Sequence, residues 1–422
     1  MSESKVESKT LPVIGCLVVM FSIGIVYLWS VFQQPVIDYY GWVPTSVSLI
    51  SSVMIFMFLF GSMIGGFIQD KKSPRFVITL GGILFFIGLF SSSLIGEGSP
   101  WMMYITYGTI AGIGVGFAYA GSLQSIQKWF PHKRGFASGI SVCAFGLSMV
   151  AFSPLIEWFL QLPAFGDNAV PLTFRILAVL FTVIIIIAGF FVKNPSPEYV
   201  KSLNLPQKFV SKKQYTTKEM FKTGPFWCLA FTTFFLPAAY MMIIPLVKTL
   251  AVTRGIPPFQ ASLTVSLMGV ASAVSRLLSG VVSDKLGRAK TVFILAVLAM
   301  ISAILMIFAD GWVYTAVILL VVFAYAGPSS IYPAMSMDVY GEKYSGGNYG
   351  MVLLSLGISS PVWTLLSNKL NADGFATGNY TLSFIVAACV CVVPLIALPL
   401  FDYFKAKMEK NPEKIQEDNP GK

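Results

Sequence analysis

The sequence predicts an all-α membrane protein in which twelve transmembrane helices form two six-helix halves. Three observations lead to this prediction. Long apolar runs recur through the whole chain. Only 11% of the 422 residues are charged, against about 25% in a typical soluble domain. Short motifs of the first half also recur at corresponding places in the second half.

The apolar runs are long enough to cross a bilayer. A hydrocarbon core about 30 Å thick needs roughly 20 helical residues at about 1.5 Å each. The runs that meet this length lie near residues 11–33, 46–69, 75–96, 102–127, 135–160, 172–192, 225–248, 258–283, 290–309, 312–336, 347–368 and 379–401. The first run is too long and too uninterrupted for a cleaved signal peptide, so we expect it to stay in the membrane.

A polar segment divides the runs into two sets of six. Residues 193–222 are basic and contain three prolines, which is typical of a linker. We therefore expect an N-terminal tail over 1–10, six-helix bundles over 11–192 and 223–401 on either side of the linker, and a C-terminal tail over 402–422.

Two motifs repeat between the halves. The segment Gly66–Arg75, between the second and third runs, has a counterpart in Gly280–Lys290, between the eighth and ninth. The segment Phe117–Gly121 recurs as Phe323–Gly327 with the same five residue types. Because each half has an even number of spans, both insert in the same orientation. We expect them to be related by an axis along the membrane normal.

The distribution of charge predicts the orientation. A formal net charge of +10 would suggest a nucleic-acid partner for a soluble protein. Here, however, 24 of the 29 lysines and arginines lie on one side of the predicted spans. The positive-inside rule predicts that this side, with both termini, faces the cytoplasm from the cell (inner) membrane. The lipid bilayer then accounts for the charge without any nucleic acid.

Neither a metal site nor a cofactor is expected. All five cysteines lie inside predicted spans, and the only histidine is His132. The cysteines therefore read as small buried apolar residues. The sequence also lacks HExxH, GxSxG and P-loop motifs, so we do not expect an enzyme.

Arg276 is the one charged residue deep in the eighth run. It precedes Asp284, at the polar end of the run, by eight residues, so it lies about 12 Å deeper, near the middle of a bilayer. A cation at that depth usually faces a partner or a water-filled cavity. No acidic residue lies at a similar depth, and a planar guanidinium fits a carboxylate. We predict that Arg276 binds the anionic substrate of a carrier; a carrier of cationic drugs would need a membrane carboxylate instead.

The repeated loops carry a resemblance to a known family. They resemble the G-x-x-x-D-x-x-G-x-R pattern of the major facilitator superfamily, the first through Gly66, Asp70 and Arg75. The second loop carries the two glycines and the aspartate of the pattern through Gly280, Asp284 and Gly287, and Arg288 follows Gly287 directly. The chain is identified as a member of that superfamily. Within it, the chain resembles the oxalate/formate antiporter family and the bacterial monocarboxylate transporters, through Arg276 and the segments Tyr27–Ser30, Trp129–Gly139 and Asn348–Gly350.

The resemblance implies a secondary active transporter, expected as a monomer, for a small organic anion. Dicarboxylate carriers of the family bear a second cation at a place that corresponds to about Leu356. This chain has no Lys or Arg between Lys343 and Lys369. One buried cation balances one carboxylate, whereas a dianion would stay half paired at low dielectric. We therefore expect a monocarboxylate such as lactate, pyruvate, formate or acetate.

Tyrosines are the further candidates for the substrate site. Tyr119 and Tyr325 hold corresponding places in the repeat, and Tyr332 lies about two turns beyond Tyr325. A phenol offers a hydrogen-bond donor on an apolar body, which suits a small carboxylate. The resemblance implies that Tyr119 and Tyr332 contact substrate. By their positions in the spans, the other candidates for lining the cavity are Tyr325, Tyr27, Leu28, Phe145 and Leu356.

Charged residues at the cytoplasmic ends of the helices are candidates for a gate. Asp70 and Asp284 close their helices beside several cations. With Arg75 and Arg288, they are expected to form pairs that break and reform as the halves rock. The glycines over Gly135–Gly146 have the spacing of close helix contacts, so we expect them to serve packing.

The sequence leaves the coupling mechanism open. A monoanion on Arg276 neutralises the site, and a neutral site crosses a low-dielectric barrier more easily, which favours anion exchange. Net transport would need a proton as well. Proton-linked relatives place an Asp one turn before the arginine, where this chain has Ser272. The resemblance favours proton-linked monocarboxylate transport. Exchange of the oxalate/formate type and a sensor on a carrier fold remain the alternatives.

Overall fold

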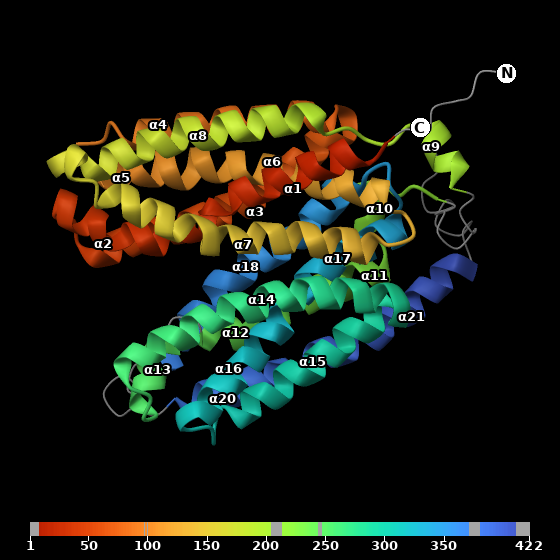
Figure 1. Ribbon diagram of the computed structural model, residues 1–422. Helices are drawn as coiled ribbons and strands as arrows, with labels where there is room; N and C mark the ends of the chain where they lie inside the picture. Colours follow the sequence, from red (N-terminus) through yellow and green to blue (C-terminus); the bar gives the residue numbers. More distant parts are fainter. Residues whose placement is uncertain are drawn as a thin grey trace.

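The protein is a bundle of long helices in two groups, which lie side by side and are inclined to one another (Figure 1). A computed structural model describes residues 8–96, 98, 100–203, 213–243, 247–370 and 380–410. The first group, the N-half, contains α1 (Thr10–Ile23), η1 (Gly24–Leu28), α2 (Trp29–Tyr40), α3 (Pro44–Lys71), α4 (Pro74–Ser92), α5 (Pro100–Met103), η2 (Tyr104–Ala111), α6 (Gly112–Trp129), α7 (Arg134–Leu160), η3 (Pro163–Asn168) and α8 (Ala169–Phe191).

The second group, the C-half, follows two short helices, α9 (Pro197–Ser202) and α10 (Thr217–Phe221). It contains α11 (Gly224–Phe235), α12 (Ala238–Ile243), α13 (Val247–Thr253), α14 (Pro258–Leu286), α15 (Arg288–Leu305), α16 (Gly311–Ala326), α17 (Pro328–Tyr340), α18 (Ser345–Leu370), α20 (Thr381–Val390) and α21 (Val392–Lys410). The all-α class is confirmed.

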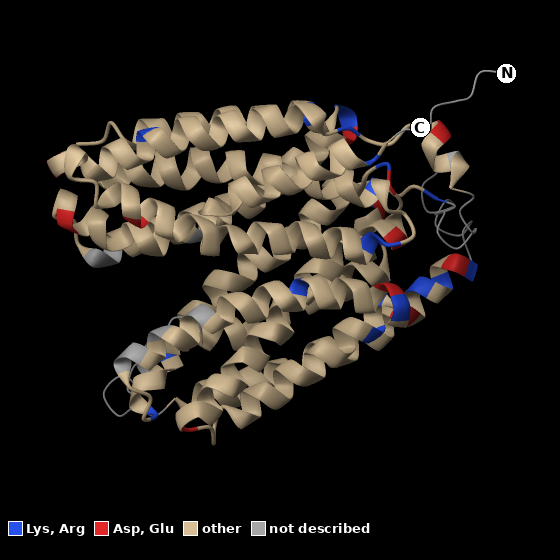
Figure 2. Ribbon diagram, in the orientation of Figure 1, with Lys and Arg blue, Asp and Glu red and all other residues tan. Residues whose placement is uncertain are grey.

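Eleven stretches within the described residues are individually long and apolar enough to cross a membrane. The remaining predicted span is built from α5, η2 and α6, and its η2 segment has wider π-helical turns. Together they give the twelve-span arrangement that the sequence predicts. Most charged side chains lie at one end of the bundle, the right-hand end in Figure 2. We call this the basic end; α3 and α14 end there, and α4 and α15 begin there.

The sharp turns at the basic end have local causes. Between α14 and α15, Gly287 adopts φ +99°, which a residue with a side chain rarely reaches. The corresponding turn between α3 and α4 needs no glycine, because Lys72 is extended at φ −120° and the Ser73 hydroxyl caps α4 by accepting from the Phe76 N–H. This is why the first loop tolerates Ser73 where the family pattern has glycine.

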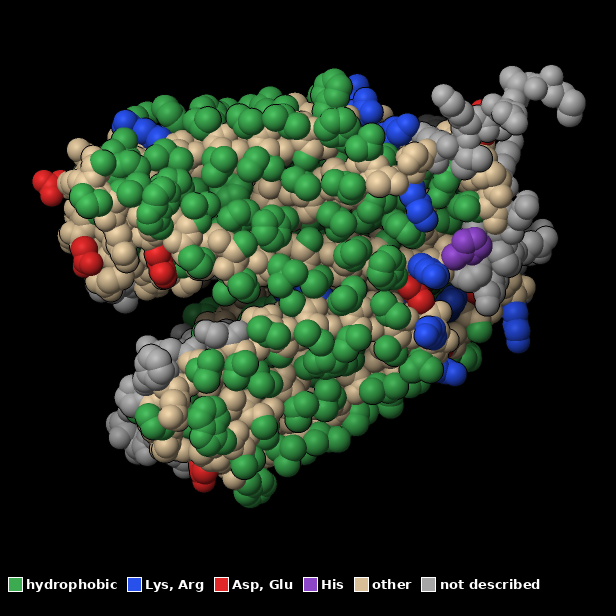
Figure 3. Space-filling model, in the orientation of Figure 1, with side chains coloured by type: hydrophobic (Ala, Val, Ile, Leu, Met, Phe, Trp, Pro, Cys, Tyr) green, Lys and Arg blue, Asp and Glu red, His purple; other side chains and the backbone are tan. Residues whose placement is uncertain are grey.

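The two halves touch backbone to backbone at the basic end. There α7 packs along α14, and α3 along α18. A Cβ built on Gly280 would lie 2.2 Å from the carbonyl oxygen of Gly135, and one built on Gly66 would lie 2.2 Å from that of Gly346. Only glycine permits approaches this close. At the opposite end the halves separate around a hollow, visible in the left part of Figure 3.

Candidate substrate site and gate

A cavity of about 60 Å³ lies between the halves and contains Arg276. The N-half lines it with Phe58, Leu59, Tyr119, Val142 and Phe145. The C-half lines it with Thr233, Leu236, Pro237, Arg276, Tyr325, Pro328, Ser329, Tyr332, Tyr349, Val352, Leu353 and Leu356. A water-sized group needs roughly 10–15 Å³ of such space, so the cavity suits a guest of a few non-hydrogen atoms.

The guanidinium of Arg276 is buried and only weakly held. Its residue is 7% exposed. Nη1 donates to the Val142 carbonyl oxygen at 3.4 Å, a long hydrogen bond. In the described part of the chain, Nε finds no hydrogen-bond partner, and no acidic side chain pairs with the group or lines the cavity. A buried cation without a counter-ion is costly, and an anion bound beside it would offset this cost.

Aromatic rings form the wall of the N-half. Tyr119 packs edge-on against Phe58 and Phe145, with ring centroids 5.2 Å and 5.4 Å apart. Phe58 and Phe145 stack at 5.7 Å. Together these rings enclose an apolar space opposite the cation. They suit the hydrocarbon end of a small carboxylate better than a second charged group.

On the C-half side, Tyr332 and Tyr349 are buried in the lining. With Tyr119 of the N-half, they give the cavity lining three tyrosines that are mostly buried. Tyr325 is half-buried and stacks on Tyr240 with ring centroids 3.8 Å apart. The sequence analysis did not predict Tyr349 as a site residue, although the Asn348–Gly350 motif already drew attention to it.

Two breaks in the C-half helices also line the cavity. The helix is interrupted between α11 and α12, at Leu236 and Pro237, and between α16 and α17, at Gly327 and Pro328, although Leu236 and Gly327 keep right-handed helical φ and ψ. Irregular backbone at membrane depth is tolerated where it faces a cavity. The sequence analysis missed this contribution. The sequence signal for these interruptions is Pro237 in one apolar run and the Gly327–Pro328 pair in another.

One of the predicted lining positions is not brought to the cavity, and the structure does not describe the side chain of another. Leu28 ends η1 and is fully buried in the hydrophobic core, outside the cavity lining. Tyr27 also belongs to η1, but its side chain lies outside the described part of the structure. The other six predicted binding residues line a single cavity: Arg276, Tyr119, Tyr332, Tyr325, Phe145 and Leu356.

At the basic end, two aspartates join the halves in the same way. The Asp284 carboxylate of α14 accepts from the N–H groups of Gly135 and Phe136 at the start of α7, at 3.0 Å and 2.8 Å. The Asp70 carboxylate of α3 accepts from the N–H groups of Gly346 and Gly347 at the start of α18, at 3.0 Å and 2.7 Å. A carboxylate at a helix N-terminus is favoured by the free N–H groups and the helix dipole.

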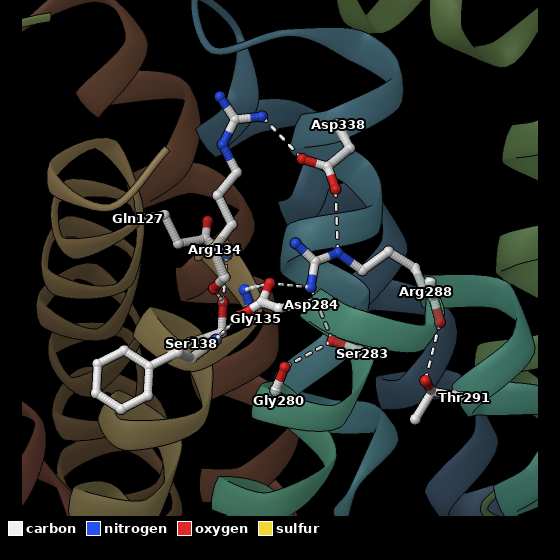
Figure 4. Close-up of polar contacts among 12 residues, drawn as sticks. Gln127, Arg134, Gly135, Ser138, Gly280, Ser283, Asp284, Arg288, Thr291 and Asp338 are labelled. Carbon is white, nitrogen blue, oxygen red and sulfur yellow. Dashed lines mark hydrogen bonds and ion pairs between the residues drawn. The ribbon is translucent and has the colours of Figure 1, made fainter. Parts of the chain in front are cut away.

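Ion pairs reinforce the Asp284 side of this junction. Arg288 donates through Nη1 to Asp284 at 2.5 Å and through Nε to Asp338 at 3.0 Å. Figure 4 shows Asp338 between the guanidinium groups of Arg288 and Arg134. Arg134, on the N-half, donates to Asp338 at 2.8 Å and also pairs with Glu342. These ion pairs, together with the backbone contacts of Asp70 and Asp284, close the basic end, and we call the whole set the gate.

Arg75 lies away from the gate. Its Nε donates to the Val192 carbonyl oxygen at 3.0 Å, so it ties two segments of the N-half together. Arg288 follows Asp284 by four residues, whereas Arg75 follows Asp70 by five. The residue of the first loop that corresponds to Arg288 is therefore Pro74. Arg75 therefore lies one position further along its helix than Arg288 does, and it contacts Val192 instead of the gate.

The family model for the major facilitator superfamily matches residues 14–364. The chain belongs to the major facilitator superfamily. This confirms the resemblance inferred from the two loops, and members of the superfamily are transporters rather than enzymes. An oxalate:formate antiporter from Oxalobacter formigenes is 25% identical over 417 residues, which cover 97% of this chain and 94% of that protein. Monocarboxylate transporter 13 from Bos taurus is 24% identical over 94% of this chain and 88% of that protein.

Solved structures of the superfamily share the fold. The E. coli fucose:proton symporter FucP has a TM-score of 0.68 at 14% identity, covering 93% of this chain and 98% of that one. The proton:xylose symporter XylE has a TM-score of 0.66 at 16% identity, covering 92% and 93%. The chain is therefore a multi-pass membrane protein with a superfamily transporter fold.

Asn348 fastens the linker to this transporter's basic end. Its Nδ2 donates to the Tyr215 carbonyl oxygen at 2.9 Å, and its Oδ1 accepts from the Thr217 hydroxyl at 2.9 Å. The Tyr215 N–H in turn donates to the Tyr340 carbonyl oxygen. Burial, and to a smaller degree the Glu219 carboxylate, raises the pKa of the Tyr215 phenol, so this ring stays neutral.

Replacing Asn348 with alanine should therefore loosen the linker. Two hydrogen bonds in a buried position are lost, which we expect to lower the free energy of unfolding by about 1–3 kcal/mol. Limited proteolysis of reconstituted protein should cut the linker faster, while Asn168→Ala, on an exposed turn, leaves the rate unchanged. Equal cleavage rates in wild type and Asn348→Ala would argue against this anchoring.

Proposed function

We propose that this transporter carries small monocarboxylates, such as lactate or pyruvate, by alternating access, and that a proton moves with each anion. The observation that carries the proposal is Arg276: a buried guanidinium without a carboxylate partner among the described residues, in a cavity between the two halves. The substrate carboxylate supplies the missing counter-ion, and the nearby phenols donate to its second oxygen.

The cavity supports a monoanion rather than a dianion. Its described lining holds one cation, and the place where the family's dicarboxylate carriers bear a second cation is occupied by Leu356. A second carboxylate would be buried against rings and aliphatic side chains, at a high desolvation cost. The volume of about 60 Å³ also favours a molecule of few atoms.

The proposal assigns the present conformation to the outward-facing state. The basic end corresponds to the cytoplasm by the positive-inside rule, with both termini on that side of the cell membrane. In this state the gate closes the cytoplasmic path while the halves separate at the other end (Figure 3). Rocking of the halves would break the pairs at Asp70 and Asp284 and expose Arg276 to the cytoplasm.

Anion exchange is the second candidate, and two observations favour it. The chain is similar over 97% of its length to an oxalate:formate antiporter. No carboxyl group lines the described cavity to accept a proton, so the proton would have to travel on the substrate. In an exchanger, the empty cationic site would cross the membrane too slowly for net transport.

Uptake of labelled lactate into proteoliposomes separates these candidates. Proton-linked transport predicts that an inwardly directed proton gradient, with the outside more acidic, drives lactate accumulation in vesicles that contain no substrate anion. Dissipating the gradient with a protonophore should abolish it. No response to the gradient, with strong stimulation by internal lactate or formate, would establish exchange instead. Thermal stabilisation by lactate without any flux would identify a sensor on a carrier fold.

A further inference from the structure

Gly146, on α7, is in contact with the end of the Arg276 side chain. A Cβ built on Gly146 would lie 2.3 Å from Nη1 and 3.5 Å from Cζ of Arg276. Apart from its own helix and chain neighbours, this Cβ would meet no other described atom within 4 Å. The space left by the missing side chain is therefore filled by the guanidinium and by nothing else.

The other glycines of α7 on this seam serve a different purpose. A Cβ on Gly139 would lie 2.8 Å from the Arg276 carbonyl oxygen. One on Gly135 would lie 2.4 Å from the Gly280 carbonyl oxygen and 2.3 Å from Nη1 of Arg288, so Gly135 admits both a backbone and a gate side chain. Those two positions allow helix backbones to approach, as the sequence analysis expected for the whole segment. At Gly146 the neighbour is instead the flexible end of the proposed substrate-binding side chain.

The backbone one turn earlier completes the contact. The Val142 carbonyl oxygen accepts from Nη1 at 3.4 Å, while Nε keeps no described partner. Thus α7 contacts the guanidinium through Nη1, and the buried edge that contains Nε keeps no described hydrogen-bond partner. That edge is one of the two through which an arginine binds a carboxylate with two parallel hydrogen bonds.

We propose that Gly146 is a positioning residue for substrate affinity: its missing side chain lets the guanidinium lie against α7, which turns the Nε edge toward the anion. This inference depends on the proposed function of Arg276. Since α7 belongs to the N-half and Arg276 to the C-half, the contact also belongs to the outward-facing arrangement and changes when the halves rock.

The test compares Gly146→Ala with Gly269→Ala in proteoliposomes. Both variants add one methyl group to a glycine in a long helix, but a Cβ on Gly269 meets no described atom within 4 Å. Because a misplacement of about 1 Å can cost up to about 100-fold, we expect Gly146→Ala to raise the KM for lactate by about 10- to 100-fold. The maximal rate and the unfolding temperature without substrate should stay near wild type, as should all values for Gly269→Ala.

Several outcomes would overturn the inference. One is a KM for Gly146→Ala equal to that of Gly269→Ala, and another is a fall in maximal rate at unchanged KM, which would indicate a structural role. If Gly146→Ala misfolds, combining it with Arg276→Lys removes the clashing Nη1 and should restore the unfolding temperature. A double variant that stays misfolded contradicts the contact. Full uptake by Arg276→Lys alone would instead refute the proposed function.

Discussion

Replacing Arg276 with lysine is expected to lower lactate uptake about 10- to 150-fold, while the protein still inserts and folds. Lysine keeps the charge but has one donor centre in place of the planar fork, so the second hydrogen bond to the carboxylate is lost. A hydrogen bond between charged groups contributes about 1.5–3 kcal/mol, and about 1.4 kcal/mol corresponds to tenfold in affinity. Initial rates of uptake into proteoliposomes, measured over a range of lactate concentrations, give the loss.

Arg175→Lys is the matched control. Arg175 is a half-buried arginine on a membrane helix, and its Nε donates to the Ser93 hydroxyl at 3.1 Å, away from the cavity. This variant should transport at close to the wild-type rate. Lactate should stabilise wild type and Arg175→Lys against thermal unfolding but leave Arg276→Lys unaffected. If Arg276→Lys binds lactate with wild-type affinity, Arg276 does not hold the carboxylate through two hydrogen bonds.

The sequence predicts the architecture well because a bilayer imposes simple requirements. A spanning helix must be long and apolar, and this requirement is visible without any tertiary information. Arg276 stands out for the same reason, since a permanent charge in an apolar run needs a special environment. The repeat then indicates that spans four and ten correspond, which is how Tyr119 and Tyr325 come to be predicted on the cavity.

What the sequence does not reveal is which face each span turns to the cavity. The α-helix places neighbours on one face at about 3.6 residues per turn, but the stretch Gly24–Leu28 is a 3₁₀ helix with about three. The tighter winding rotates Leu28 into the core. Proline also interrupts helices at Leu236–Pro237 and Gly327–Pro328, and Leu236, Pro237 and Pro328 themselves line the cavity.

At the gate, the two repeated loops differ in the position of one arginine, and the motif alone does not reveal the consequence. Asp70 and Asp284 accept the same kind of N–H pair, as the repeat suggests. Arg75 and Arg288 differ by one position relative to those aspartates, and one residue rotates a side chain by about 100° around a helix. Arg288 pairs with Asp338, an acid on α17 that the family pattern does not include, whereas Arg75 donates to the Val192 carbonyl oxygen.

Asp284→Asn is expected to open the gate and shift the transporter toward the inward-facing state. The carboxylate accepts two N–H groups from α7 and pairs with Arg288, and its side chain is only 10% exposed. An amide has one oxygen and an NH₂ group in place of the second oxygen. At least one of these contacts therefore places the amide N–H against another N–H donor, which cannot form a hydrogen bond. Losing one or two charged hydrogen bonds at about 1.5–3 kcal/mol each would change the ratio of the two states by at least tenfold.

Spin labels can measure this shift directly. Lys72 and Lys343 are exposed residues on opposite halves of the basic end, next to the Asp70 contacts rather than the Asp284 contacts. In a variant without native cysteines, cysteines at these two positions should show a longer distance in Asp284→Asn than in wild type. The apparent affinity for external lactate should fall as well, because fewer molecules present the outward-facing site.

Glu409→Gln removes a carboxylate at the same end without touching the gate. Glu409 is 68% exposed and pairs only loosely with Lys405, at 4.0 Å, so its loss should leave both the distance distribution and the uptake unchanged. If Asp284→Asn behaves like Glu409→Gln, the carboxylate does not hold the halves together, and closure depends on the glycine contacts between backbones. If the distance lengthens only in Asp284→Asn, the charge of this carboxylate rather than the close backbone contacts keeps the basic end closed.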